Sequence, residues 1–462
     1  MRNFLPLFLA VALLRAGPAL TVYNGGFAVV RDTLPVQVRE GVTSVAYSGA
    51  TAQVEPDSVI LRDVTGKAAF RILEQSYRND AVSQPMLLSF FEGKELEFVR
   101  RNVNRPDEVV RGKVIRSGHV PGGGSVQPII EVDGRLRFSL PGEPMFPSLG
   151  DGSILRPTLT WKIQSAADAK FDAEVAYLSN GFQWEASYNL VAPEKGDLVD
   201  VVGWVTINNQ SGTTFNEALV KLMAGDVNRV VEHFARGMGG GVPMAMAAVA
   251  DKVVTEKSFD EFHLYTLANP VTLRDRETKQ VEFVRATGVK AERVYVYEGR
   301  CQEFYGETPP EANKVQVYRE LMNTEANGLG MPLPKGKFRF YAQDDDRRME
   351  FVGENQIDHT PKGERLRVLT GNSFDLVGEH RRTDLRRNND RVISETYEVK
   401  LRNRKKEPVE IRLVEHMAHW SDWTISENAL PYTKLDSHRA EFRVPLKPDE
   451  EKVITFRVNY VW

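Results

Sequence analysis

Short runs in which apolar and polar side chains alternate recur along most of this chain. The run from Phe182 to Leu190 alternates without a break, and the pattern returns from Lys452 to Tyr460. Alternation with a period of two is typical of a strand with one buried face. No segment has helical periodicity long enough for a crossover helix, which disfavours a parallel α/β sheet. The chain is therefore predicted to be all-β, an array of a small SH3-like barrel and Ig-like antiparallel β-sandwiches.

The first nineteen residues have the features of an export signal. Arg2 supplies a positive charge, Phe4 to Leu14 is apolar, and small residues from Ala16 to Ala19 suit signal peptidase. The apolar run is shorter than the ~20 residues that span a bilayer. The alternative is a buried N-terminal helix. We predict a signal peptide over residues 1–19 and an extracytoplasmic mature chain, which is periplasmic, secreted or loosely associated with the envelope.

Charge and cysteine content exclude several classes of protein. The 462 residues carry 60 Lys and Arg against 63 Asp and Glu, and removal of Arg2 and Arg15 leaves 58 basic residues. This mildly acidic balance argues against a nucleic-acid binder, and the basic stretches 381–387 and 402–406 are interpreted as solvated loops. Cys301 is the single cysteine, so no internal disulfide can form. No transmembrane segment is expected in the mature chain, and no cofactor is predicted.

Turn signals and changes in composition suggest the domain boundaries. The predicted units are N-terminal strands over 20–56, an SH3-like barrel region over 57–149, a β-sandwich over 150–305 and a C-terminal β-sandwich over 306–462. The second unit is expected to contain one short helix, capped by Ser83 and followed by Gly93. A Met- and Gly-rich stretch over 236–256 predicts a flexible loop inside the first sandwich.

Several stretches of the mature chain are similar to one bacterial family of unknown function. They are Leu20–Asn24, Ala28–Arg31, Trp184–Tyr188, Gly203–Asn209, Leu222–Arg229, Phe262–Leu267, Ile357–Glu364 and Gly371–Asp375. The family's domain forms the C-terminal part of proteins named mucoidy-inhibitor-like. Better-known members carry a long coiled coil before it, which is missing here. The resemblance implies export and a β-rich fold, and it implies no known reaction and no catalytic residues.

A hydrolytic site is the first candidate for catalysis. Asp358 and His359 precede a turn that ends at Glu364, and Asp375 follows on the next stretch. A histidine oriented by a carboxylate can act as a general base. The alternative is that Asp358 and Thr360 make local side-chain to backbone hydrogen bonds that shape the turn. We favour the turn and list no catalytic residue beyond these four weak candidates.

Metal ligands are weakly indicated at two places. His416 and His419 share a face only on a helix, whereas the preceding alternation predicts a strand, on which they point to opposite faces. The methionines Met238, Met244 and Met246 resemble a soft-metal set, but such residues in a Gly/Ala loop more often form a linker. We predict no metal site.

Binding surfaces are indicated more clearly than catalytic ones. Trp420 and Trp423 lie in a segment that looks like a loop, where an exposed aromatic pair would form a binding surface. The triplet Asp344–Asp346 is expected to be a charged hairpin turn rather than a calcium loop. The favoured hypothesis is an exported, non-enzymatic protein that binds an envelope protein or polysaccharide. The alternative is an envelope-directed hydrolase that uses Asp358, His359 and Glu364.

Overall fold

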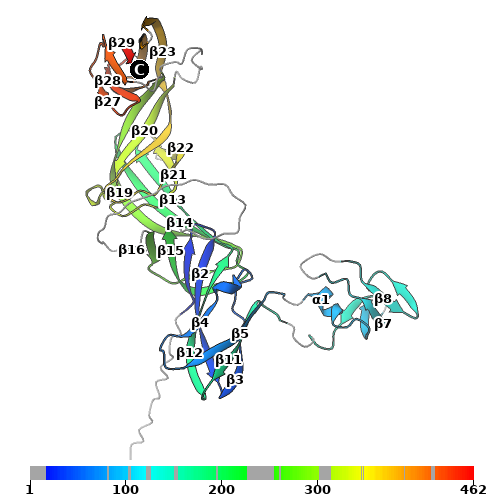
Figure 1. The fold of residues 1–462 in the computed structure, drawn as a ribbon. Coiled ribbons are helices and arrows are strands. Elements are labelled where there is room, and N and C mark those ends of the chain that lie inside the picture. The colour runs from blue at the N-terminus through cyan, green and yellow to red at the C-terminus, as the bar shows by residue number, and fades with distance from the viewer. Residues whose placement is uncertain are drawn as a thin grey trace, which may run out of the picture.

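The computed structural model confirms an all-β, multi-domain chain, and strands make up most of what it describes (Figure 1). It describes residues 17–80, 83–101, 106–120, 126–149, 154–193, 196–225, 254–259, 262–300, 314–344, 346, 348–389, 391–417 and 422–461. Within these residues the helices are short: α1 (Gln84–Ser89) and the 3-10 turns η1 (Pro56–Ser58) and η3 (Glu325–Asn327). No described helix has the length and apolar character needed to cross a membrane.

Two sheets form an N-terminal sandwich. The larger sheet contains β16 (Val254–Phe259), β17 (Phe262–Leu267), β15 (Phe215–Ala224), β1 (Ala19–Tyr23), β2 (Phe27–Val38), β12 (Ala169–Asn180) and β4 (Ile60–Asp63) in that order, with β18 (Val271–Leu273) on β15. The smaller contains β3 (Gly41–Tyr47), β11 (Thr158–Ser165) and β5 (Phe70–Arg78). Alternate residues of both sheets share one core, in which Trp161 of β11 and Val175 of β12 are fully buried.

A long sheet forms the rest of the body. Its main path contains β22 (Met349–Ile357), β21 (Gly336–Gln343), β13 (Phe182–Pro193), β14 (Leu198–Asn209), β19 (Glu277–Arg300), β20 (Lys314–Met322), β23 (Arg365–Asn389), β24 (Val392–Asn403), β29 (Glu451–Val461) and β26 (Asp422–Ser426). Strands β25 (Val409–His416), β28 (Arg439–Leu446) and β27 (Tyr432–Lys434) branch from β19. The predicted hairpin at Asp344–Asp346 lies between β21 and β22, which pair antiparallel, although Asp345 is outside the described residues.

Strand β19 connects two cores. Its first half pairs with β14, and its second half pairs with β20 and β25. Ala291 on this strand belongs to the core that includes the N-terminal sandwich, whereas Tyr297 belongs to a separate C-terminal core. The predicted domain boundary near 305 is therefore not a boundary between sheets. The strand β19 pairs with β14, which precedes that position, and with β20 and β25, which follow it.

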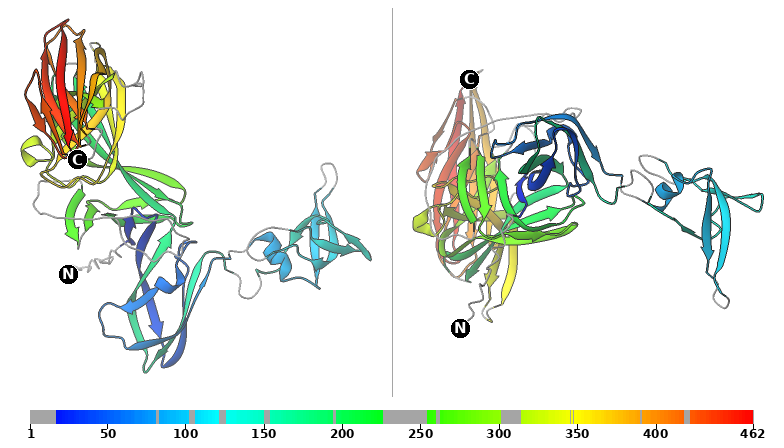
Figure 2. Two further views of the ribbon diagram at one scale, coloured as in Figure 1. Left: turned by 45° about the horizontal axis from the view of Figure 1, so that its top comes forward. Right: turned by 90° about the horizontal axis from the view of Figure 1, so that it is seen from below.

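A small domain, here called the inserted domain and comprising residues 83–149, is inserted into the N-terminal sandwich. Strands β5 and β11 pair antiparallel, and Arg78 lies opposite Thr158. The inserted domain thus replaces the turn of a β-hairpin, and Figures 1 and 2 show it set apart from the other sheets. Its five strands follow the order β10 (Glu143–Met145), β6 (Glu95–Arg100), β7 (Glu108–Arg116), β8 (Ile129–Val132) and β9 (Arg135–Arg137).

The predicted domain ranges need two further corrections. The sheet of the inserted domain is open, because its end strands β10 and β9 do not pair among the described residues, so the SH3-like barrel is not closed. The range 57–149 also includes β4 and β5, which belong to the N-terminal sandwich. Of the predicted signal, residues 1–16 lie outside the described part, but Ala19 already belongs to β1.

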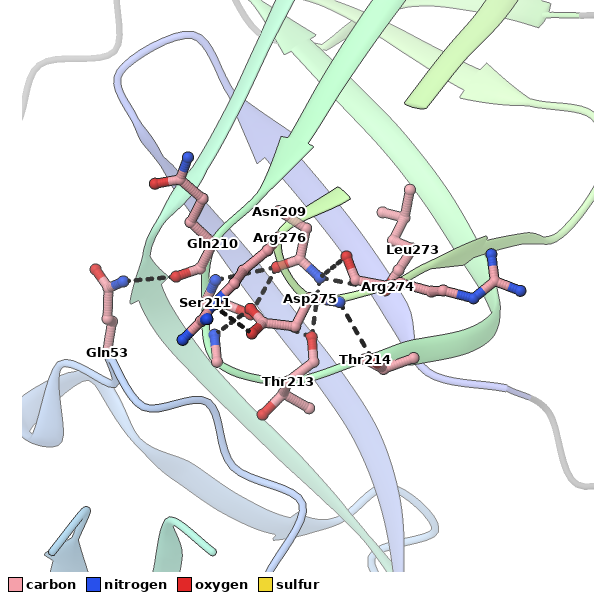
Figure 3. Close-up of polar contacts among 11 residues, drawn as sticks. Gln53, Asn209, Gln210, Ser211, Thr213, Thr214, Leu273, Arg274, Asp275 and Arg276 are labelled. Atoms are coloured by element: carbon pink, nitrogen blue, oxygen red, sulfur yellow. Dashed lines mark hydrogen bonds and ion pairs between the residues drawn. The ribbon is translucent and has the colours of Figure 1, made fainter. Parts of the chain in front are cut away.

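A polar junction at Asn209 joins strand ends of the long sheet to strand ends of the larger sheet of the N-terminal sandwich (Figure 3). Its Nδ2 donates to the carbonyl oxygens of Thr213 at 2.9 Å, Leu273 at 3.2 Å and Arg274 at 3.1 Å. Its Oδ1 accepts hydrogen bonds from the backbone N–H and the hydroxyl of Ser211. The side chain is 1% exposed, so protein groups supply the partners that water would otherwise provide.

Neighbouring contacts extend this junction across the fold. The Gly212 N–H donates to Asp275 Oδ1 at 2.8 Å, and the Asp275 N–H donates to Thr214 Oγ1 at 3.1 Å. Gln53 Nε2 donates to the Gln210 carbonyl at 2.8 Å, as Figure 3 shows. The loop before η1, the turn after β14 and the turn before β19 are therefore held together by hydrogen bonds.

Candidate functional site

The inserted domain folds around a small core set by alternation along its strands. The core side chains are Leu88, Leu96, Phe98, Val114, Ile130 and Val132. Gly112 faces this core, where a Cβ atom would lie 2.7 Å from Ile130 Cγ2, so the strand can pack closely only without a side chain there. The side chains that lie between these core positions on β6 and β7 point to the outer face of the sheet, because successive side chains of a strand alternate between its two faces.

Helix α1 forms where the sequence predicts a short helix, and its Leu88 packs in the core of the inserted domain. Ser83 is the N-cap, and its hydroxyl accepts a hydrogen bond from the Met86 N–H at 3.4 Å. Pro85 lies in the first turn, where its missing N–H costs nothing. The helix ends at Ser89 with Phe90 as its C-cap, two residues before the predicted end at Phe91, and Gly93 beyond it has a φ of +80°. The predicted short helix is confirmed.

The outer face of this sheet carries exposed apolar side chains among charged ones. Val109, Leu136 and Met145 are 58%, 58% and 56% exposed. Met145 lies opposite Glu97, which forms an ion pair with Arg111 at 3.1 Å. Apolar groups bordered by paired charges are a common composition for a surface that binds another protein.

The edge strand β9 gives this face a second binding feature. Among the described residues it pairs with β8 alone. Asp133 and Gly134 connect β8 to β9 with φ values of 51° and 70°, as a tight two-residue hairpin turn requires. All three residues of β9 are exposed, and Phe138 just after it is 61% exposed. An exposed edge with unpaired backbone groups can accept an added strand.

The four weak catalytic candidates lie on exposed backbone. Asp358 and His359 lie in the turn between β22 and β23, where the Lys335 N–H donates to His359 Nδ1 at 3.2 Å. Thr360 donates to the carbonyl of Asp358, which fits the turn-forming alternative. Glu364 directly precedes β23, Asp375 lies within it, and both are exposed. Nothing in the described geometry brings the four together or supports the hydrolase hypothesis.

Only the first residue of the histidine pair lies in the described part of the chain. His416 is the last residue of β25, and its Nε2 lies 2.5 Å from Glu298 Oε2 of β19. His419 lies outside the described residues. Within the described part of the chain, no group of three His, Cys, Asp or Glu residues could hold a metal ion. The described residues also exclude Cys301, the three loop methionines and most of the 236–256 stretch. The end of that stretch, Val254–Glu256, belongs to β16.

The predicted tryptophan surface needs correction at the position that the structure describes. Trp423 is 4% exposed and belongs to the C-terminal core. Its Nε1 donates to the Ser437 carbonyl at 2.6 Å, and Lys434 Nζ lies 4.2 Å from the centre of the ring. The segment is strand β26, paired with β29, and its alternation turns Trp423 inward. Trp420 lies outside the described residues.

Sequence reasoning missed a buried ionisable pair in the C-terminal core. His380 Nε2 lies 3.1 Å from Glu415 Oε2, and the two side chains are 2% and 0% exposed. Two glycines make room, since a Cβ at Gly299 would lie 2.2 Å from Glu415 Oε1, and one at Gly378 would lie 2.2 Å from the Tyr297 ring. A sequence signal was available for Glu415 alone, which follows Val409, Ile411 and Leu413 on the inward side of β25.

The pair affects the protonation of its members. Burial opposes protonation of His380, but the charge and hydrogen bond of Glu415 outweigh it, and the pKa of His380 lies above its ordinary value. Burial, reinforced by the Glu415 charge, raises the pKa of Tyr297. The pair is packed among the aromatic rings of the core: the His380 ring lies 5.0 Å from that of Tyr397. It therefore has the character of a structural pair rather than a substrate site.

Stability is expected to fall with rising pH because of His380. A histidine with a raised folded pKa contributes its full stabilisation below the unfolded value, near 6.5, and loses it as pH rises through the folded pKa. The denaturation midpoint of the C-terminal core should therefore decrease above about pH 6.5, and His380→Gln should flatten that decrease. His359→Gln, on an exposed turn, is the control, and a decrease of equal slope in His380→Gln would contradict the assignment.

Comparisons with known proteins leave the chain without an assigned family. No family model matches it, and a search of curated proteins finds no match either. The resemblance to the mucoidy-inhibitor-like family therefore stays a prediction. The candidate binding surface rests on the geometry of the inserted domain alone.

Proposed function

We propose that this protein is an exported, non-enzymatic binding protein, and that the inserted domain holds a protein of the cell envelope. The observation that carries the proposal is the placement of an open five-stranded sheet at the tip of the β5–β11 hairpin. A domain in this position can contact a large partner while the N-terminal sandwich and the long sheet stay clear of it (Figure 1).

The surface chemistry favours a protein over a polysaccharide. Sugar-binding surfaces use exposed aromatic rings as stacking platforms, whereas Phe138 is a single ring here beside the exposed aliphatic side chains of Val109, Leu136 and Met145. The free edge of β9 suits an extended peptide segment, which would gain main-chain hydrogen bonds along the strand. Leu136 and Phe138 would then contact the side chains of that segment.

Paired substitutions on the edge test this proposal. The variant Leu136→Glu/Phe138→Glu is expected to retain the partner from envelope extracts roughly 30-fold more weakly, as for the loss of a binding hot spot. Val64→Glu is the matched control, because Val64 is 61% exposed on a turn of the N-terminal sandwich. Quantitative mass spectrometry of the retained proteins is the measurement.

The outcomes separate specific from non-specific retention. A protein retained by the wild type and by Val64→Glu, and lost from the double variant, supports the proposal. Equal retention by all three chains places binding elsewhere and overturns the role of β9. Failure to retain any envelope protein removes the proposed function itself.

A further inference from the structure

The first described residues are an integral part of the N-terminal sandwich. Strand β1 begins at Ala19 and lies between β15 and β2, with parallel and antiparallel pairing respectively. The residue before β1 is already hydrogen-bonded to β15, because the Pro18 carbonyl accepts a hydrogen bond from the Leu219 N–H at 2.9 Å. Leu20, next along the strand, is 1% exposed.

Cleavage after Ala19, the end of the sequence-predicted signal, is incompatible with this packing. A new terminus at Leu20 would place a charged ammonium group between β15 and β2, on a residue that is 1% exposed in the uncut chain. Burial of an unpaired charge is strongly unfavourable. The cut would also remove the Pro18 carbonyl and leave the Leu219 N–H without its acceptor.

The backbone at Gly17 is also closely packed. A Cβ atom there would lie 2.3 Å from the carbonyl oxygen of Glu217, so the chain passes directly against β15. Gly17 and Pro18 line a cavity of about 470 Å³ together with Asp32 and Tyr47. The Tyr47 hydroxyl donates to Asp32 Oδ2 at 2.8 Å. A terminal ammonium at Gly17 would therefore border an open space that contains a carboxylate, rather than a closed core.

We propose that signal peptidase hydrolyses the Ala16–Gly17 peptide bond and that Gly17 is the first residue of the mature protein. Water supplies the hydroxyl to the Ala16 carboxylate, and Gly17 keeps the amino group. Ala16 is a small residue directly before this cut, but Leu14 stands where the A-x-A pattern has its other small residue, so the packing of Gly17–Ala19 and not the motif selects this bond. The inference rests on the proposed export, since only an exported chain meets this peptidase.

The first residue of the exported protein tests the inference directly. We expect N-terminal sequencing and intact mass of the extracytoplasmic full chain to give Gly17. The variants Ala16→Phe and Ala19→Val separate the two sites, because each puts an unsuitable residue before one of the possible cuts. Ala16→Phe should accumulate as precursor, whereas Ala19→Val, which keeps a good strand former in β1, should be processed like the wild type.

Each outcome has a distinct meaning. A mature chain that begins at Leu20, or a block in Ala19→Val alone, overturns the cleavage site and leaves export intact. A wild-type chain that keeps Met1 inside the cell overturns both the site and the proposed function. Purified chains that begin at Gly17 and at Leu20 give a second measurement, and the shorter one should unfold roughly 5 °C lower.

Discussion

A chain in which residues 80–157 are replaced by one glycine is expected to keep its body folded and to lose binding to the envelope protein that we propose as its partner. The replacement leaves Asn79 and the new glycine as a two-residue turn between Arg78 and Thr158, which already lie opposite each other. Asn-Gly is the favoured sequence for such a turn. The core under this hairpin, with Trp161 fully buried, does not draw on the removed domain.

The free energy of unfolding of the body should stay the same or rise by up to about 2 kcal/mol, because a short turn closes with less loss of chain entropy. The removed ion pair between Arg78 and Asp80 is exposed, and such pairs stabilise by less than about 1 kcal/mol. Denaturant unfolding followed by tryptophan fluorescence measures the body, and the envelope pull-down measures binding.

This experiment has two ways to fail. A shortened chain that no longer folds would show that the inserted domain is needed for the core, against the topology. A shortened chain that folds and still retains the partner would show that the binding surface lies elsewhere. The double substitution at Leu136 and Phe138 then distinguishes loss of the edge from loss of the whole domain.

Replacement of Asn209 is expected to produce the largest loss of stability for a single side chain. Asn209→Ala removes the partner of the buried Leu273 carbonyl and of the buried N–H and hydroxyl of Ser211, and it removes the donor to the part-buried carbonyls of Thr213 and Arg274. Each unsatisfied buried group costs about 1–3 kcal/mol, so a loss of about 3 kcal/mol or more is expected.

An isosteric variant separates hydrogen bonding from packing at this position. Asn209→Asp keeps the shape but replaces the donor by a carboxylate oxygen that faces three carbonyl oxygens, so it should destabilise at least as much as alanine. Asn208→Ala is the matched control on the same strand. Asn208 is half-buried and accepts one hydrogen bond, from Thr278, so its loss should cost less than about 1 kcal/mol.

Denaturant midpoints of the three variants measure this effect, with Trp161 and Trp184 as reporters in the same core. If Asn209→Asp were as stable as the wild type, the junction would not depend on the donated hydrogen bonds. If Asn208→Ala were as damaging as Asn209→Ala, the loss would reflect the strand end in general rather than the network.

The strands were predictable where alternation was long, as from Phe182 to Leu190, because a half-buried strand needs that pattern wherever it pairs. Helix α1 was predictable because Ser83, Pro85 and Gly93 each act locally. Trp423 was misplaced because its strand is only five residues long, too short for alternation to stand out from a loop.

The sites depended on contacts between residues far apart in sequence. His380 and Glu415 are 35 positions apart, and they meet because β23 and β25 both face the C-terminal core. The open sheet of the inserted domain was missed for a similar reason, since strand order and closure are not encoded in the pattern of any single strand.

The sequence by itself determined that this protein is all-β, because the side-chain period, the turn residues and the helix cap all act over a few neighbouring residues. Tertiary structure alone decided where the domains divide and which charges lie inside. Those features depend on which strands hydrogen-bond to one another. Residues distant along the chain, such as Pro18 and Leu219 or Arg78 and Thr158, become neighbours only through that pairing.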